Sequence, residues 1–368
     1  MRYAAAAAIF LLSAAASAQN GRWTEDRANA WYSKQPWLVG ANYIPSTAIN
    51  QLEMWQAETF DPERIDIELG WAEGLGMNTI RVFLHDLVWE QNPAGFQQRI
   101  DRFLAIAAKH NIRPMFVLFD SCWDPNPRLG EQREPRAGVH NSGWVQSPGA
   151  KALRDRRNYA RLERYVKGVV GAFANDPRVL AWDLWNEPEN QNSSSYGKQE
   201  PRNKVALAAA LLPGVFAWAR SSAPTQPVTC GVWKGNWADA ESLSRMQRIA
   251  LDSSDVISFH SYEDAERFRA RIQSLKRLHR PILCTEYMAR GVGSTFQGSL
   301  PVARELHVAA YNWGLVLGKT QTNLPWDSWK NPYIDREPPV WFHDIFSPDG
   351  RPYRKDEADF IERMTSGR

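Results

Sequence analysis

The sequence predicts a single-domain (β/α)8 barrel, or TIM barrel, and three observations lead to this prediction. Short apolar runs typical of buried strands recur eight times, and helical patterns fill most of the gaps between them. No fixed-period repeat and no linker divides the 368 residues, a length that α/β barrels reach as one domain. An open doubly wound sheet is the competing interpretation, but no Gly-rich turn follows the first run, at 37–43.

The expected strands are rich in aliphatic and aromatic residues, as strands buried on both faces of a parallel sheet are. They cover residues 37–43, 78–84, 112–119, 179–185, 227–232, 256–259, 281–284 and 313–317. The expected helices cover residues 62–76, 96–110, 156–174, 203–221, 237–250, 264–278, 300–311 and 355–364. Asp61 caps the first helix and Pro62 takes its first position, where the missing N–H of proline costs nothing.

Two long irregular segments interrupt this alternation, 121–155 after the third strand and 319–353 after the eighth. Both follow the carboxyl ends of strands, the face on which barrels build their active sites. Long loops in a compact domain are usually functional. The first segment carries four basic residues that suit the wall of a cleft, namely Arg128, Arg133, Arg136 and His140.

The composition excludes several classes of function. Lys and Arg number 44 against 41 Asp and Glu, so a formal charge of +3 offers no electrostatic attraction to nucleic acid or to an anionic membrane. No apolar run approaches the roughly 20 residues that a membrane helix needs. The outlying number is 17 Trp, whose rings suit stacking on flat ligands.

The N-terminus predicts a targeting segment. Basic Arg2 precedes an apolar run from Ala4 to Ala16, and Ala16-Ser17-Ala18 is a small-residue cleavage site. We expect a secretory signal peptide at 1–18, one folded domain at 19–368, and export to the periplasm or the medium. A buried N-terminal helix is the alternative.

Three cysteines remain, and an odd number leaves at least one free thiol in an exported protein. Their spacing matches no zinc pattern, so we expect no metal site and no cofactor. Cys230 and Cys284 lie in strand-like runs and are expected to be buried. Cys122 lies in a loop, where either a free thiol or a disulfide is compatible with the sequence.

Two glutamates stand where strands are expected to end. Pro188 cannot donate to a ladder, so the fourth strand ends by Glu187. The apolar run of the seventh strand ends in Glu286, and a Gly-containing loop follows it. These strands lie on opposite sides of the barrel mouth. Paired carboxylates across a cleft are the apparatus of glycoside hydrolysis, at about 5–5.5 Å for retention and about 6.5–9.5 Å for inversion. Helix capping and metal coordination are the alternatives, although the His residues do not cluster with these glutamates in sequence.

Around these glutamates the chain resembles the retaining glycoside hydrolases of clan A, and most of all the cellulase-type family 5. The resemblance rests on Asn186-Glu187-Pro188 and on Glu286, and it extends over roughly residues 36–364. It implies that Glu187 is the acid/base, that Glu286 is the nucleophile and that Asn186 binds the 2-hydroxyl of the sugar. It also implies retention of configuration.

The same resemblance implies roles for three further residues. Arg81, in the second strand, matches the family arginine that pairs with the nucleophile, and a guanidinium there keeps Glu286 ionised. His260-Ser261-Tyr262 matches a His-x-Tyr pattern, in which Tyr262 bonds the nucleophile and His260 lines the sugar site. A surface salt bridge for Arg81 and a plain rim position for His260 are the alternatives.

The chain departs from the family pattern in two places. Beyond the third strand the family often has a His-rich motif, for which Asp120 and Trp123 are the expected substitutes. The family also places a Trp at the end of the eighth strand, beneath the sugar. We expect Trp326 there, with Trp329 nearby, because Trp313 falls inside the predicted strand. These departures indicate a divergent subgroup.

Eight Trp residues fall in or near the loops expected after strands. We expect some of them to line a sugar cleft, because an indole face stacks on the apolar face of a pyranose. They are Trp55, Trp89, Trp123, Trp144, Trp233, Trp237, Trp326 and Trp329.

The sequence therefore predicts an exported retaining β-glycoside hydrolase that acts on a β-1,4-linked glucan, mannan or xylan. If loop 121–155 closes the cleft, cleavage occurs at chain ends, and if it lies flat, cleavage is internal. The alternatives are an exo-acting β-galactosidase or β-mannosidase, a transglycosylase using the same residues, and a non-catalytic carbohydrate-binding barrel. A binding barrel needs no acid and nucleophile, so Glu187 and Glu286 together speak against it.

Overall fold

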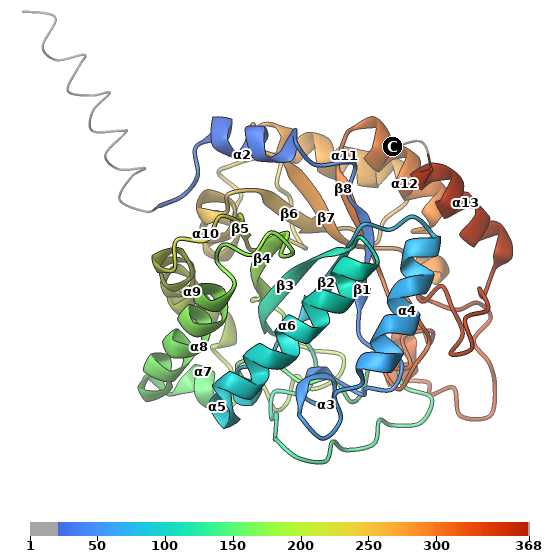
Figure 1. Cartoon of the computed structure of the whole chain (residues 1–368), viewed down its shortest axis with the longest axis horizontal. Helices are drawn as coiled ribbons and strands as arrows, with labels where there is room; N and C mark the ends of the chain where they lie inside the picture. Colours follow the sequence, from blue (N-terminus) through green and yellow to red (C-terminus); the bar gives the residue numbers. More distant parts are fainter. Residues whose placement is uncertain (1–20, 367–368) are drawn as a thin grey trace, which may run out of the picture.

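A computed structural model describes residues 21–366 and contains the predicted single-domain (β/α)8 barrel (Figure 1). The strands are β1 (Val39–Tyr43), β2 (Thr79–Phe83), β3 (Arg113–Asp120), β4 (Ala181–Asn186), β5 (Val228–Thr229), β6 (Ile257–His260), β7 (Ile282–Tyr287) and β8 (Ala309–Trp313). They are parallel and follow one another in the order β5-β4-β3-β2-β1-β8-β7-β6. A bridge between Val232 and Phe259 joins the two ends of the sheet and closes the barrel.

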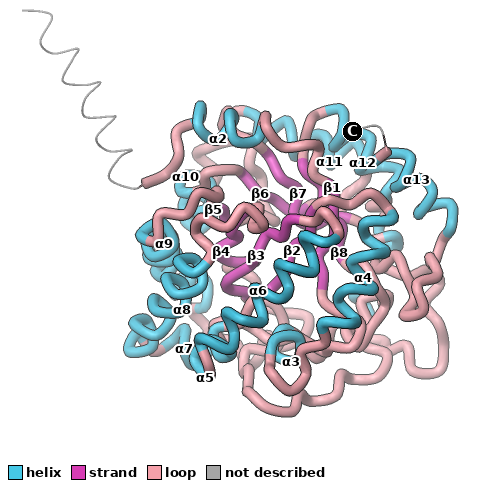
Figure 2. Tube along the Cα trace, in the orientation of Figure 1, coloured by secondary structure: helices cyan, strands magenta, loops and turns pink. Residues whose placement is uncertain are grey.

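Helices surround the strands (Figure 2). They are α2 (Glu25–Tyr32), α3 (Gln51–Trp55), α4 (Pro62–Gly74), α5 (Asp86–Gln91), α6 (Pro93–Lys109), α7 (Ala150–Arg154), α8 (Tyr159–Ala172), α9 (Lys204–Ser221), α10 (Arg245–Ser253), α11 (Ala265–Lys276), α12 (Phe296–Glu305) and α13 (Lys355–Thr365). The start of α4 is as predicted, because the Arg64 N–H donates to Asp61 at 2.9 Å and Pro62 takes the first turn.

The prediction of an eighth strand at 313–317 is wrong, and so is the helix at 300–311. β8 covers Ala309–Trp313 and α12 ends at Glu305. Pairing with β1 fixes this register, since Val39 lies opposite Ala310. Gly314 follows with φ +78°, a conformation that glycine adopts without steric cost, and it ends the strand. Trp313 therefore stands at the carboxyl end of β8.

Two other elements are shorter than predicted. β5 has two residues, and beyond it Val232 pairs with Phe259 of β6 through a single bridge. The helix expected from 237 begins only at Arg245, because Ser244 and Gln247 form a reciprocal capping box there. The chain between these elements forms a loop at the carboxyl end of the barrel.

The remaining sequence predictions concern the cysteines and the N-terminus. Cys230 and Cys284 are buried as predicted, and Cys122, Cys230 and Cys284 are all free thiols. Among the helices within residues 21–366, none is long and apolar enough to cross a membrane. The predicted signal peptide at 1–18 lies outside the described residues.

Candidate active site

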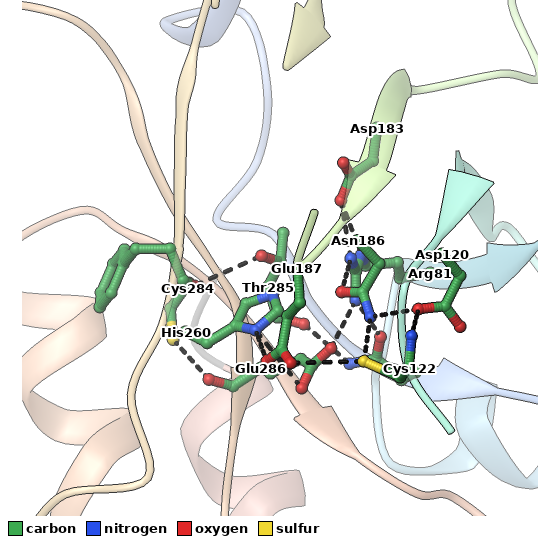
Figure 3. A network of polar contacts seen from close by, with 12 residues as sticks. Arg81, Asp120, Cys122, Asp183, Asn186, Glu187, His260, Cys284, Thr285 and Glu286 are labelled. Atoms are coloured by element: carbon green, nitrogen blue, oxygen red, sulfur yellow. Dashed lines mark hydrogen bonds and ion pairs between the residues drawn. The ribbon is translucent and has the colours of Figure 1, made fainter. Parts of the chain in front are cut away.

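A cleft of about 520 Å³ lies at the carboxyl ends of the strands. Most of the predicted site residues line it, namely Trp123, Asn186, Glu187, His260, Tyr262, Glu286, Trp326 and Trp329. Arg81 is fully buried and reaches the site through its contact with Glu286. Side chains from β2, β4, β6 and β7 thus converge on one place (Figure 3).

Glu187 follows the last residue of β4 and has a left-handed backbone, with φ +45°. Such a conformation is rare for a residue with a Cβ and is typical of functional sites. Its Oε1 lies 2.9 Å from His260 Nδ1, and its Oε2 accepts a hydrogen bond from Asn190 Nδ2 at 2.7 Å. The Cys122 thiol also donates to Oε2, with Sγ at 3.3 Å.

Glu286, near the end of β7, accepts hydrogen bonds from stronger donors than those that contact Glu187. Arg81 Nη1 lies 2.9 Å from its Oε1, and the Tyr262 hydroxyl donates to its Oε2 at 2.8 Å. His260 Nδ1 is 3.5 Å from the same Oε2, so the imidazole lies between the two glutamates. One oxygen of each carboxylate lies within 4.8 Å of the other, closer to the roughly 5–5.5 Å typical of retaining enzymes than to the roughly 6.5–9.5 Å of inverting ones.

Arg81 is anchored by three other polar side chains. It forms a salt bridge with Asp183 at 2.8 Å, and it donates to Asn42 and to Asn186, also at 2.8 Å. Burial by itself disfavours the charged guanidinium, but Asp183 and Glu286 outweigh it and raise the pKa of Arg81. The surface salt bridge considered for Arg81 is therefore wrong, because this side chain is a fixed, buried cation.

Burial dominates the protonation of the other groups. It raises the pKa of both Glu187 and Glu286, although Arg81 opposes this effect at each of them. It lowers the pKa of His260 to about 4, so the imidazole is neutral at neutral pH. Two buried carboxylates this close share a proton more readily than they both ionise.

Glu187, His260 and Glu286 also raise the question of a metal, since one donor atom of each lies within 4.8 Å of the others. The histidines do not cluster with the glutamates in sequence, but the fold brings His260 between them. Arg81 Nη1 already lies 2.9 Å from Glu286 Oε1 and the Tyr262 hydroxyl donates to Oε2, so a metal ion bound to Glu286 would be repelled by the neighbouring guanidinium. The donor set therefore fits carboxylate chemistry better than a metal centre.

Asp120, expected to replace a family histidine, supports Asn186 instead of lining the cleft. Its Oδ1 accepts from Asn186 Nδ2 at 2.9 Å, and its Oδ2 accepts from Trp144 Nε1 at 2.6 Å. Burial raises the pKa of Asp120 to about 6. Trp123, the other expected substitute, lines the cleft and stacks on Trp329 at 5.3 Å.

The structure places Trp313, and not Trp326, at the end of the eighth strand. Trp313, at the end of β8, lines the cleft and occupies the strand-8 position for which Trp326 was predicted. Trp326 also lines the cleft, but in a 3-10 turn at Trp326–Trp329, edge-on to Tyr262 at 5.1 Å. The eighth strand was predicted four residues too late, which is why Trp313 was expected inside the strand and not at its end.

The eight Trp residues divide into two groups. Five line the cleft, namely Trp123, Trp144, Trp233, Trp326 and Trp329. The other three pack elsewhere. Trp55 donates to the Phe83 carbonyl at 2.8 Å, Trp89 packs beside Tyr165 of α8, and Trp237 packs on Phe259 of the core.

The two long loops, after β3 and after β8, are joined to each other. The Asn141 N–H donates to the Thr320 carbonyl at 2.8 Å, and Trp329 Nε1 donates to the His140 carbonyl at 3.0 Å. Tyr333 N–H donates to Gly138 at 2.9 Å, and the Arg136 guanidinium lies over the Trp329 ring. The joined loops form a continuous wall along one side of the cleft, which we call the loop wall.

Sequence reasoning missed several residues of the site. Asp183 carried a signal, because a carboxylate inside an apolar strand must find a buried cation. Asn42 and Trp313 also lie on strands. The side of the barrel to which their side chains point follows from the pairing register of those strands. Asn190 lies in a loop, and no local pattern pointed to it.

Comparisons with known proteins agree with this geometry. Residues 72–331 match the family model for cellulase (glycosyl hydrolase family 5). Mannan endo-1,4-beta-mannosidase A of Emericella nidulans is 29% identical over 91 residues, which are 25% of this chain. The chain thus spans only about a fifth of that relative, 21% of its length.

Solved structures share the fold. The endo-beta-1,4-mannanase of Thermotoga petrophila has a TM-score of 0.57 at 15% identity, covering 91% of this chain and 77% of that one. An exo-beta-1,4-mannosidase from Opitutaceae bacterium strain TAV5 has a TM-score of 0.58 at 18% identity, covering 90% and 59%. The family match covers well over half of the sequence and contains both glutamates, and the chain belongs to glycosyl hydrolase family 5.

Proposed function

We propose that the chain is a retaining β-glycoside hydrolase that cleaves β-1,4-linked glycans of the mannan type. The observation that carries this proposal is the pair of buried carboxylates within 4.8 Å of each other in one cleft, with different donors on each. A separation this short is typical of retaining enzymes. Mannan is proposed because the sequence relatives are named mannan endo-1,4-beta-mannosidases.

In this mechanism Glu286 attacks the anomeric carbon and forms a glycosyl-enzyme ester, while Glu187 gives its proton to the departing oxygen. Glu187 then takes a proton from water, which attacks the same carbon and releases Glu286. Burial supports the first step by raising the pKa of Glu187. Arg81 supports it by holding Glu286 ionised. The reaction uses no metal and no cofactor.

The other site residues position the sugar. Asn186, fixed between Arg81 and Asp120, is proposed to bind the 2-hydroxyl. Tyr262 orients Glu286, and His260 orients Glu187. Trp313 is proposed as the platform under the reacting sugar, with Trp123, Trp326 and Trp329 at its flanks.

Internal cleavage is the mode that the relatives' names favour. Removal of sugars from a chain end is the second candidate, because the loop wall bounds one side of the cleft. We also propose export by a signal peptide at 1–18, with action in the periplasm or the medium, since a polysaccharide substrate does not enter a cell.

The test uses purified protein with mannan, β-glucan, xylan and galactan oligosaccharides, and product anomers followed by NMR. We expect β-anomers first, from mannan-type substrates. Mannose alone from reduced mannohexaose would favour the exo mode, and a ladder of sizes the endo mode. Binding without any product would contradict the proposal and favour a carbohydrate-binding barrel.

Glu187→Ala tests the acid/base role separately. We expect hydrolysis of mannooligosaccharides to fall by about 10³-fold, because the departing alkoxide loses its proton donor. The first step on a 2,4-dinitrophenyl glycoside should be nearly unchanged, since that leaving group needs no proton. Equal losses on both substrates would contradict the assignment.

A further inference from the structure

Two donors from different loops meet on one oxygen of Glu187. Asn190 Nδ2 lies 2.7 Å from Oε2, and Cys122 Sγ lies 3.3 Å from the same atom. His260 Nδ1 contacts the other oxygen, Oε1, at 2.9 Å. The carboxyl group is therefore held on both oxygens, which leaves it little freedom to rotate.

The direction of the Asn190 amide follows from its neighbours. The Asn192 N–H donates to Asn190 Oδ1 at 2.9 Å, so the NH2 end of the amide must face Glu187. The Asn190 N–H also donates to the Glu187 carbonyl at 2.8 Å and closes a turn over Pro188. Glu187 itself has φ +45°. The turn from Glu187 to Asn190 and the Asn190 side chain therefore form one unit, which fixes the Glu187 carboxyl group relative to β4.

Cys122 connects this unit to Asn186. Its Sγ lies 3.4 Å from Asn186 Nδ2 and 3.5 Å from Asn190 Nδ2, two N–H donors, so the S–H remains free to donate to Glu187. Burial raises the pKa of the Cys122 thiol well above its usual range, so the group keeps its proton. The Cys122 thiol thus accepts hydrogen bonds from two amides and donates one to a carboxylate. An apolar side chain of the same size would make none of these three hydrogen bonds.

We propose that Asn190 and Cys122 are positioning residues for Glu187, whose N–H and S–H groups orient its carboxyl group and stabilise its ionised form. The inference rests on the proposed function, in which Glu187 is the acid/base. Its ionised form is needed when Glu187 accepts a proton from water. Its orientation is needed when it protonates the departing oxygen.

Other charged and titratable groups also face Glu187, and variants must leave them in place. They are Arg81 from β2, Asp120 after Phe119 on β3, Lys234 beyond β5, His260 and Tyr262 at the end of β6, Glu286 on β7, and Glu189 in the same turn. Asn190 and Cys122 are neutral donors, so their removal changes no net charge.

The experiment measures kcat/KM against pH for Asn190→Ala, Cys122→Ala and Cys122→Ser. Removing a donor to the carboxylate raises the pKa of Glu187, so the alkaline limb of the profile moves to higher pH. We expect a shift of about one pH unit for Asn190→Ala and about 0.3 for Cys122→Ala. Cys122→Ser keeps a donor and should return the limb to within about 0.1 unit of the parent.

A second readout separates positioning from folding. For Asn190→Ala, kcat/KM on a β-1,4-mannooligosaccharide should fall about tenfold, and on 2,4-dinitrophenyl β-mannobioside less than about twofold. The activated substrate also reports that the variant is folded. Cys230→Ala is the matched control, because it removes a buried thiol that donates to the Trp185 carbonyl instead of to a carboxylate.

The proposal is overturned if the alkaline limb stays in place in both alanine variants, or if both substrates lose activity equally. The second result assigns the two residues to folding of the loops alone. Failure of the proposed function looks different, because Glu187→Ala would then itself fail to discriminate between the two substrates.

Discussion

Glu187 and Glu286 are buried to nearly the same degree, 8% and 5% exposed, yet they receive different partners. Glu286 contacts a guanidinium and a phenol, from Arg81 and Tyr262. Glu187 contacts an amide, a thiol and a neutral imidazole. Burial raises the pKa of both, but only at Glu286 does a cation in direct contact oppose it. A proton shared by the pair therefore belongs on Glu187.

The comparison teaches that neighbours, more than depth, distinguish the two roles. Arg81 reaches Glu286 from β2 because Asp183 on β4 holds the other face of the guanidinium. Among the residues that the structure describes, no guanidinium or ammonium group contacts the oxygens of Glu187. Its surroundings therefore favour the protonated form that a general acid needs. Substitutions of these neighbours, with matched controls elsewhere in the chain, test whether they set the difference between the two glutamates.

The largest effect is expected for Glu286→Ala, which removes the proposed nucleophile. We expect the rate to fall on the order of 10⁴-fold or more, as for removal of nucleophiles elsewhere. Added azide should enter from the vacated side and give a product of inverted configuration, identified by NMR. An azide product of retained configuration, or near-normal turnover, would contradict the assignment.

Arg81→Met should remove the asymmetry between the two glutamates. Loss of the cation raises the pKa of Glu286, so the acidic limb of kcat/KM moves to higher pH and activity is lost earlier as pH falls. We expect a rate loss of about 10²-fold. The free energy of unfolding should fall by about 3–5 kcal/mol, because Asp183 is left as an unpaired buried charge.

Arg161→Met is the matched control for Arg81, since Arg161 pairs with the buried Asp86 at 2.6 Å away from the cleft. It should lower the unfolding free energy measured in urea without moving either limb of the pH profile. An unmoved acidic limb in Arg81→Met would show that the cation does not set the ionisation of Glu286.

The smallest effect is expected at the flank of the cleft. Trp326 is 38% exposed and packs edge-on to Tyr262. Trp326→Ala should raise KM for mannotetraose about fivefold, the loss of about 1 kcal/mol of stacking, and leave kcat within about twofold. Trp341→Ala, which removes a ring stacked on Tyr353 outside the cleft, should leave both constants unchanged. A fall in kcat with constant KM would place Trp326 at the reacting sugar.

The strand-8 tryptophan shows how far local pattern carries. The sequence predicted the eighth strand at 313–317, with a helix at 300–311 before it. Pairing of β8 with β1 selected Ala309–Trp313 and so put Trp313 on the rim. A shift of four residues changed which Trp stands at the end of the eighth strand, although the predicted number and order of strands were right.

The sequence by itself determined the alternation of strands and helices and the position of Glu187 and Glu286 at strand ends. Periodicity and the restriction imposed by Pro188 act over a few residues, so they can be read locally. Only the tertiary structure decided which side chains meet. Arg81 and Glu286 are 205 residues apart, and Cys122 and Glu187 are 65 apart. Such contacts depend on the closure of the barrel and on loops packing over it, which no local pattern specifies.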